Sequence, residues 1–166
     1  MNKWDKRFIN LAETISTWSK DDSKQVGAVI VDTDRRIIST GYNGLPKNIN
    51  ENSLNKDEKL SKTLHAEMNA ILFSRRDLTG TSIYISTLPV CSLCAAVIIQ
   101  LKISRVVCKI PDNPKSKWYK SHKLAKQMLK EAKVTLEYYQ IHNKKIQKIK
   151  KTKNIKCKDK ENTKCK

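Results

Sequence analysis

The spacing of apolar residues along the chain separates helices from strands. Near the N-terminus, large apolar residues recur at spacings of four, three, four and three, so one face of a helix carries them all. These residues are Trp4, Phe8, Leu11, Ile15 and Trp18. Apolar faces and helix start and stop signals predict further helices over residues 63 to about 77, 91–100 and 118–132. We expect each helix to pack its apolar face against a core.

Short runs rich in β-branched residues predict five strands, at residues 26–31, 36–42, 81–86, 104–108 and 134–138. A short turn at residues 32–35 joins the first two, which should form an antiparallel hairpin. The later strands are separated by helices, and such crossovers favour parallel pairing with helices on both faces. The sequence therefore predicts an α/β fold with three layers, α/β/α, around a mixed five-stranded sheet.

Residues 45–62 are polar, contain a proline and several asparagines, and predict a long loop. Loops of this length are uncommon in a compact domain and tend to be functional lids or disordered segments. Just before it, Gly41 and Gly44 bracket Tyr42 and Asn43. The two glycines indicate a place where the backbone needs unusual dihedral angles or approaches a ligand closely.

With 166 residues, the chain has the size of one domain with a substantial core. No apolar run approaches the roughly eighteen residues that a membrane helix needs, and residues 1–7 lack the apolar stretch of a secretory signal. We therefore expect a cytoplasmic protein without a membrane partner. The five cysteines are an odd number, and two of them form a C-x-x-C pair. That pattern favours metal or redox chemistry in a reducing compartment over a disulfide scaffold.

The net charge of +18 is spread unevenly along the chain. Residues 139–166 hold eleven lysines against Asp159 and Glu161, a net of +9, and few large apolar residues. We expect a folded domain at residues 1–138 and a disordered, lysine-rich tail at residues 139–166. A basic tail could contact nucleic acid, but a run of like charges is more often a solvated extension, and we favour that interpretation.

One histidine and two later cysteines have the spacing of a zinc site. His65 lies in the first turn of a predicted helix with Glu67 two residues further on, and Cys91 and Cys94 open the next predicted helix. Three such ligands leave a fourth zinc position for water, whose pKa the metal lowers to about 7. The positive ends of the two helices would help to keep the thiolates deprotonated. Glu67 is then placed to move protons, and its carboxylate must stay free of the metal to do so.

Each part of this pattern has a simpler interpretation on its own. A lone C-x-x-C could be a redox pair, His65 a capping residue, and Glu67 a first-turn glutamate favoured by the helix dipole. A structural zinc is normally closed by four protein ligands, and only three are evident. Together, H-x-E and a later C-x-x-C form the signature of zinc-dependent nucleobase deaminases. Cys108, in a predicted strand, is expected to be a small buried hydrophobe rather than a ligand.

Five stretches carry a resemblance to a known family. They are Gln25-Val26-Gly27-Ala28-Val29-Ile30-Val31, Gly41-Tyr42-Asn43-Gly44, His65-Ala66-Glu67-Met68-Asn69-Ala70-Ile71, Cys91-Ser92-Leu93-Cys94 and Ile98-Ile99-Gln100. With these motifs the chain resembles the deoxycytidylate (dCMP) deaminases of the cytidine and deoxycytidylate deaminase superfamily. The glycine-bracketed motif and the long insertion that follows it are similar to the nucleotide-monophosphate branch in particular.

The resemblance implies a cytidine-deaminase-like fold and a hydrolase that converts dCMP to dUMP and ammonia, supplying dUMP for thymidylate synthesis. It implies one Zn²⁺ per subunit on His65, Cys91 and Cys94, with Glu67 as the catalytic residue. Residues 1–138 would then be a zinc-dependent deaminase domain. Homo-oligomers, either dimers or hexamers, are also implied.

The resemblance further assigns residues to the substrate and to effectors. The base pocket would be lined by the backbone of Val26, Gly27 and Ala28. Asn43 would contact the deoxyribose or the phosphate, and Lys24 and Arg105 are conceivable phosphate partners. The loop that would bind dCTP or dTTP as effectors, with Mg²⁺ accompanying the nucleotide, consists of Gly41, Tyr42, Asn43 and Gly44.

The chain departs from the family pattern just before the first cysteine. The pattern has a proline immediately before that cysteine, whereas the order here is Pro89-Val90-Cys91. The shift touches no ligand but bears on how the exocyclic amine is recognised, so another cytosine nucleoside or nucleotide is an alternative substrate. A base in RNA, as in tRNA adenosine deaminases, is a further alternative, which the insertion at residues 45–62 disfavours.

Overall fold

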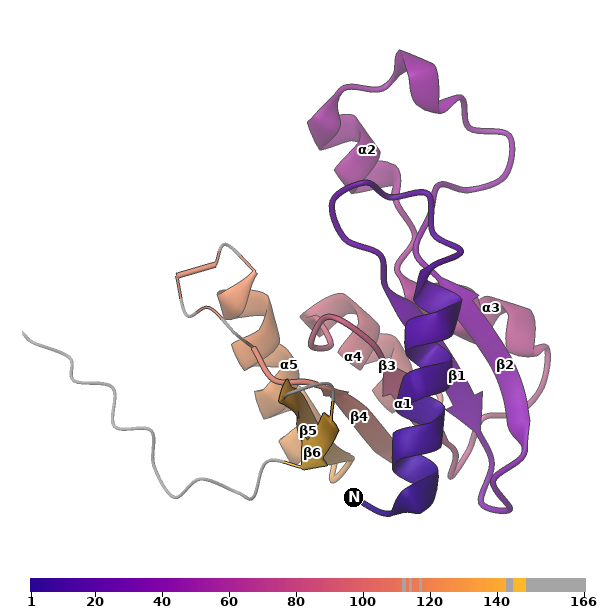
Figure 1. Ribbon diagram of the computed structural model, residues 1–166, viewed down its shortest axis with the longest axis vertical. Coiled ribbons are helices and arrows are strands. Elements are labelled where there is room, and N and C mark those ends of the chain that lie inside the picture. The colour runs from indigo at the N-terminus through magenta and orange to yellow at the C-terminus, as the bar shows by residue number, and fades with distance from the viewer. Residues whose placement is uncertain (112, 114, 117, 143–144, 149–166) are drawn as a thin grey trace, which may run out of the picture.

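A mixed six-stranded sheet forms the centre of the protein (Figure 1). The structure is a computed structural model and describes residues 1–111, 113, 115–116, 118–142 and 145–148. The strands lie in the order β2-β1-β3-β4-β5-β6. Their bounds are Gly27–Val31 (β1), Ile37–Tyr42 (β2), Ser82–Ile85 (β3), Arg105–Lys109 (β4), Thr135–His142 (β5) and Lys145–Lys148 (β6).

The sheet contains both antiparallel and parallel pairs. Strand β1 pairs antiparallel with β2, as the short turn between them predicted, and also antiparallel with β3. The pairs β3–β4 and β4–β5 are parallel, because a helix crosses over between the members of each pair. The predicted mixed α/β sheet is confirmed, and β6 adds an antiparallel edge strand.

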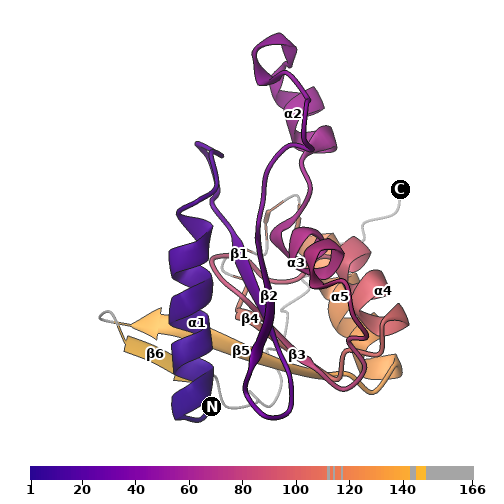
Figure 2. The ribbon, with the colours of Figure 1, turned by 90° about the vertical axis from the view of Figure 1, so that its right-hand side faces the viewer.

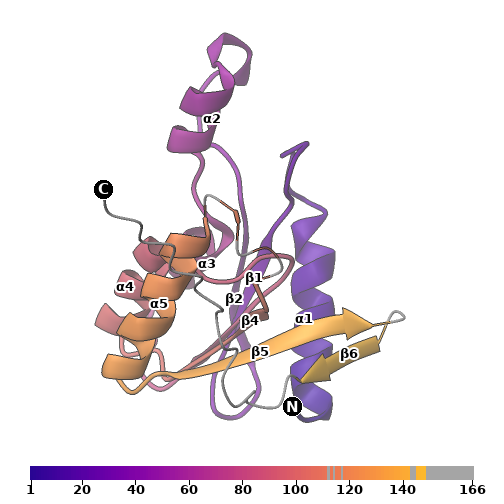
Figure 3. The ribbon, with the colours of Figure 1, turned by 90° about the vertical axis from the view of Figure 1, so that its left-hand side faces the viewer.

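Helices cover both faces of the sheet and give the three layers that the sequence predicted. Helix α1 (Lys3–Ser16) lies on one face, and α3 (Ala66–Ser74), α4 (Ser92–Gln100) and α5 (Tyr119–Glu131) lie together on the other (Figures 2 and 3). The core is divided in the same way. Phe8 and Ile15 of α1 pack with Val29, Tyr84 and Tyr139 on the first face. The larger cluster on the second face includes alternate residues of the same strands, such as Ala28, Ile30, Ile83, Ile85 and Cys108.

The first helix differs from its predicted extent at its C-terminal end. Asn2 and Asp5 form a capping box at its start, which fixes where the helix begins. It ends at Ser16, so the apolar stripe stops with Ile15. Trp18 lies beyond the helix, 58% exposed, with its ring edge against Tyr42 at a centroid distance of 6.2 Å. Its predicted role in the core was therefore wrong.

The insertion at residues 45–62 is not the long loop that its composition predicted. It contains a short 3-10 helix, η1 (Glu51–Ser53), and helix α2 (Lys56–Lys62). A capping box between Asn55 and Glu58 starts α2, yet no residue of α2 is buried. The helix therefore shows no apolar periodicity in the sequence, which explains why it was missed. Figure 1 shows α2 standing beyond the end of the sheet.

The last strands carry the fold past residue 138. Strand β5 continues to His142, and Tyr139 within it is fully buried. The Tyr139 hydroxyl donates to the carbonyl of Ile85 at 3.2 Å, which ties β5 to the site end of β3. The expected boundary at residue 138 falls inside β5. The remainder of the expected tail, residues 149–166, lies outside the described residues.

Candidate metal centre and active site

Two helix starts bring the three predicted metal ligands together. His65 is the N-cap of α3, Cys91 is the N-cap of α4, and Cys94 lies in the first turn of α4. The Nδ1 atom of His65 is 3.4 Å from the Sγ atoms of both cysteines. The three ligand atoms lie within 4.8 Å of one another, so a single ion could contact all of them. Helix α3 begins at Ala66, three residues later than predicted.

Close packing of α3 against β2 sets the position of His65. Gly41 permits this contact, since a Cβ atom there would lie 2.3 Å from the backbone nitrogen of Ala70 and 2.5 Å from the carbonyl of Ala66. The Asn69 side chain donates to the carbonyl of Tyr42 at 2.7 Å and adds a polar tie between the same elements. The sequence predicted a close approach at Gly41, and the group that approaches it is the backbone of α3.

The thiols and the imidazole perturb one another. Hydrogen bonds from Cys94 and then from His65 lower the pKa of Cys91 to about 4. The interaction with Cys91, together with burial, raises the pKa of Cys94. Hydrogen bonding to Cys91 raises the pKa of His65. These contacts favour a thiolate at Cys91, at the start of α4, where the helix dipole also favours negative charge.

Glu67 lies beside the ligands and is only 4% exposed. Burial raises the pKa of its carboxyl, and the charge of His65 opposes that rise. Its side chain contacts the thiol of Cys94. One imidazole and two sulfurs are a donor set that zinc accepts in sites with an open fourth position. The residues present therefore fit a zinc ion, with a carboxyl group next to it for proton transfer.

Comparison with known families agrees with this geometry. The family model described as the cytidine and deoxycytidylate deaminase zinc-binding region matches residues 2–110. The chain belongs to this family. The match takes in α1 through β4, with all three metal ligands and Glu67.

Several members of the deaminase family are similar over much of the chain. A protein of Aliivibrio fischeri, described as an uncharacterized deaminase in the luxG 3′ region, is 44% identical over 83% of this chain and 95% of its own length. The deoxycytidylate deaminase of Mus musculus is 39% identical over 63% of this chain and 64% of its own length. The chain thus spans slightly less than two thirds of the mouse relative.

Solved structures show the same fold. The dCMP deaminase of cyanophage S-TIM5, in complex with dCMP and dUMP, superposes with a TM-score of 0.66, at 22% identity, over 83% of this chain and 98% of that chain. The RibD protein of Acinetobacter baumannii superposes with a TM-score of 0.57, at 24% identity, over 81% of this chain and 34% of that chain. Because proteins with different names share it, the fold by itself does not choose a substrate.

The residues expected to line the base pocket lie at the start of β1. Val26, Gly27 and Ala28 are all buried there. The amide of Gly27 donates to Ser86 Oγ at 2.9 Å, and the amide of Ser86 donates back to the Gly27 carbonyl at 2.9 Å. Ser86 is fully buried at the end of β3 and was not singled out in the sequence, where a lone serine after a strand carries no signal. Contact of these residues with a base stays a prediction.

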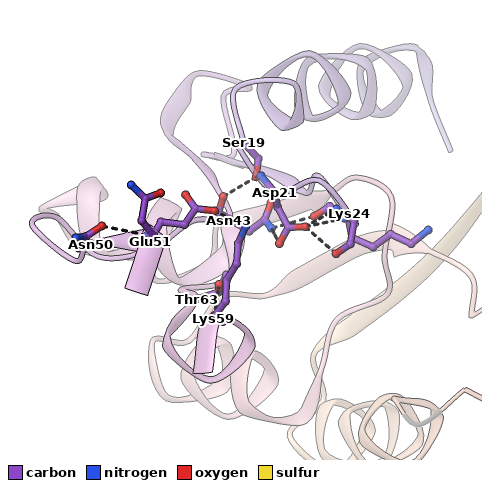
Figure 4. A network of polar contacts seen from close by, with 10 residues as sticks. Ser19, Asp21, Lys24, Asn43, Asn50, Glu51, Lys59 and Thr63 are labelled. Atoms are coloured by element: carbon purple, nitrogen blue, oxygen red, sulfur yellow. Dashed lines mark hydrogen bonds and ion pairs between the residues drawn. The ribbon is translucent and has the colours of Figure 1, made fainter. Parts of the chain in front are cut away.

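Asn43 joins two loops through its side chain (Figure 4). Its Oδ1 atom accepts from the amide of Val26 at 2.8 Å, and its Nδ2 atom donates to the carbonyl of Lys24 at 2.9 Å. Ser19 Oγ donates to the Asn43 carbonyl at 2.7 Å. Asn43 is 7% exposed, so its visible role is to hold the approach to β1. Its contact with sugar or phosphate stays a prediction.

The expected effector loop begins in β2 and leads into the insertion. Gly44 and Leu64 form an isolated antiparallel bridge, with amide-to-carbonyl distances of 3.1 and 2.9 Å. A cleft of about 260 Å³ opens beside it, with Trp18, Tyr42 and Lys59 among its lining residues. Lys59 of α2 also forms an ion pair with Glu51, as Figure 4 shows.

Two further expectations concern charge and membranes. Arg105 was a conceivable phosphate partner, but its guanidinium group pairs with Asp5 at 2.9 Å and with Glu137 at 3.3 Å. Its charge is therefore committed to the opposite face of the sheet from the metal ligands. No helix in the described part of the chain is long and apolar enough to cross a membrane.

Proposed function

We propose that the protein deaminates dCMP hydrolytically, giving dUMP and ammonia, with dUMP then available for thymidylate synthesis. The observation that carries the proposal is the convergence of His65, Cys91 and Cys94 beside the buried carboxyl of Glu67. Membership of the cytidine and deoxycytidylate deaminase family supports the reaction class. The substrate is supported by the relatives named deoxycytidylate deaminase, the mouse protein among them.

Each site residue has a distinct role in this proposal. His65, Cys91 and Cys94 would hold one zinc ion. When bound, zinc lowers the pKa of water at its open position and so supplies a nucleophile at neutral pH. Glu67 accepts one proton from the attacking water and passes it to ring N3. It then takes the second proton from the hydroxyl added at C4 and passes it to the leaving amine, which departs as ammonia. Water adds to C4 of the pyrimidine and ammonia leaves, so the carbon exchanges its amine for oxygen.

The test is ammonia release by zinc-loaded protein from dCMP, cytidine and single-stranded RNA under one set of conditions. We expect dCMP to react far faster than either of the others. Equal or greater activity on RNA would contradict the proposal and favour the alternative of a base in nucleic acid. Equal activity on cytidine would point to a broader cytosine nucleoside deaminase.

We also propose that copies of the chain associate through the outer face of α3 and α4. These helices have nine residues each and together carry one charged residue, the buried Glu67, in a chain that is 30% charged. Leu72, Phe73 and Leu93 are 58%, 55% and 76% exposed on them. Each copy carries a net charge of +18, so two copies repel each other over most of their surfaces. The repulsion is weakest at an uncharged apolar face such as that of α3 and α4, which therefore favours contact between copies there.

Sedimentation at matched protein concentrations tests this association. Leu93→Glu should shift the protein toward monomer, whereas Ile37→Glu, at a 52% exposed position of β2, should leave the oligomer unchanged. A monomeric wild-type protein, or equal dissociation of both variants, would contradict the proposal.

We further propose that the cleft beside residues 41–44 binds a nucleotide effector. Two aromatic rings, Trp18 and Tyr42, line the cleft and offer stacking surface, and Lys20 in the same lining offers a cation for phosphate. Rates measured with and without dCTP, dTTP and Mg²⁺ test this. A Tyr42→Ala variant should lose any response to effectors, and unchanged wild-type rates with either nucleotide would contradict the proposal.

A further inference from the structure

The chain around the metal ligand Cys91 is held by the first turn of α5. His122 Nδ1 lies 3.1 Å from the carbonyl oxygen of Val90, and because a carbonyl can only accept, Nδ1 must carry the proton. Ser121 Oγ accepts from the amide of Ser92 at 3.0 Å and bonds to the Ser92 hydroxyl at 2.9 Å. The residues on both sides of Cys91 are therefore tied to one helix turn.

The Val90 carbonyl that His122 holds lies in the core. Val90 is 2% exposed, so water does not reach its peptide groups freely, and a buried carbonyl without a partner is unfavourable. Cys108 of β4 is fully buried in the same hydrophobic cluster, as the sequence predicted, and burial raises the pKa of its thiol to about 12.

Val90 directly precedes the metal ligand Cys91, and its φ is not fixed by a ring as that of a proline would be. The orientation of Cys91 therefore depends on contacts from outside this turn. His122 supplies one by holding the carbonyl of Val90, and Ser121 supplies another by holding the amide of Ser92.

We propose that His122 is a positioning residue for the metal ligand Cys91 and that it acts through the carbonyl of Val90. Its imidazole is not part of the ligand group His65, Cys91 and Cys94. His122 also lies beyond residue 110, where the match to the deaminase family ends. The proposal rests on the zinc site of the proposed function but not on the choice of dCMP as substrate.

Transfer of zinc from the loaded, full-length protein to a chromogenic chelator tests the role of His122. Loss of a residue that orients a ligand typically weakens metal binding by 10–100-fold, so His122→Ala should release zinc about tenfold faster than wild type. His122→Asn keeps an N–H donor near the position of Nδ1 and should stay within about twofold of wild type. Lys123→Ala, an exposed neighbour on α5, is the matched control and should release zinc at the wild-type rate.

Two results would overturn the role of His122. One is an unchanged release rate in His122→Ala. The other is release from His122→Asn as fast as from His122→Ala, since that would show that ring volume matters and the hydrogen bond does not. Because all these readouts follow zinc, a failure of dCMP as substrate would leave them unaffected.

Discussion

Asp5 and Arg105 are paired at 2.9 Å although 100 residues of chain separate them. The hydroxyl of Tyr84 donates to the same carboxylate oxygen of Asp5 at 2.8 Å. Helix α1, β3 and β4 are thus joined by one polar cluster inside the otherwise apolar layer between α1 and the sheet. The side chain of Asp5 is 2% exposed and that of Arg105 is 20% exposed. Solvent therefore screens the pair only weakly.

Asp5→Asn should destabilise the fold by roughly 3 kcal/mol at neutral pH, because it leaves the Arg105 charge without its buried partner. Burial alone would raise the pKa of Asp5, but hydrogen bonds from Arg105, the Asn2 amide and Tyr84 bring it below the ordinary value of 3.8. The contribution is therefore complete above that value and is lost as the pH falls through the lower, folded-state pKa. Urea unfolding of both proteins should show their difference narrowing below about pH 4. A difference that stays constant to pH 2 would contradict this assignment.

Gly41→Ala should weaken both stability and zinc retention. A Cβ atom at residue 41 would meet the backbone of α3, which carries His65 and Glu67, so the helix must shift. Overpacking of this kind costs about 1–3 kcal/mol. Gly44→Ala is the control, since nothing lies within 4 Å of its Cβ position. Thermal unfolding and metal content measure the outcome, and equal behaviour of the two variants would show that the contact has no consequence.

Glu67→Gln should reduce turnover by at least about a hundredfold, the lower end of what a general acid-base residue contributes. The amide has the same shape as the carboxyl group but cannot accept the proton from water. Zinc content should not change, because the ligand group is His65, Cys91 and Cys94. Metal analysis beside the activity assay separates the two effects. Loss of zinc from this variant would assign Glu67 to metal binding instead.

Truncation at two places should distinguish the folded C-terminal strands from the lysine-rich segment that follows. Removing residues 149–166 should leave the rate on mononucleotide nearly unchanged. Removing residues 139–166 also deletes the fully buried Tyr139, the second half of β5 and all of β6. The free energy of unfolding should therefore fall sharply. Soluble yield and unfolding temperature would show the difference. A large loss of activity on removal of residues 149–166 alone would show that this segment is needed for function.

The sequence predicted those parts of the fold and site that depend on residue type and local spacing. The central strands are nearly continuous runs of β-branched residues. One histidine and two cysteines at this spacing are typical of a zinc site and of few other sites. The antiparallel β1–β2 hairpin and the parallel β3–β4 and β4–β5 pairs were predicted from the connections between the strands, whereas the antiparallel β1–β3 pair was not. These features were readable because each depends on a few neighbouring residues.

Features that depend on contacts between distant segments were not predicted. Helix α2 buries no residue and so leaves no periodic pattern. His122 meets the Val90 carbonyl across 32 residues, and a side chain that bonds a distant backbone group carries no motif. Trp18 continued the apolar spacing of α1, but the helix ends two residues before it. In each case, tertiary structure decided what local spacing could not.

The bridge between Gly44 and Leu64 closes the insertion at its base, one residue before His65. Because the two ends are hydrogen-bonded to each other, the path of β2 and the start of α3 do not depend on what lies between them. A segment closed in this way can be lengthened, shortened or replaced at a small entropic cost. The protein can therefore acquire a new surface at residues 45–63 by exchanging that segment alone, while the geometry around the metal stays as it is.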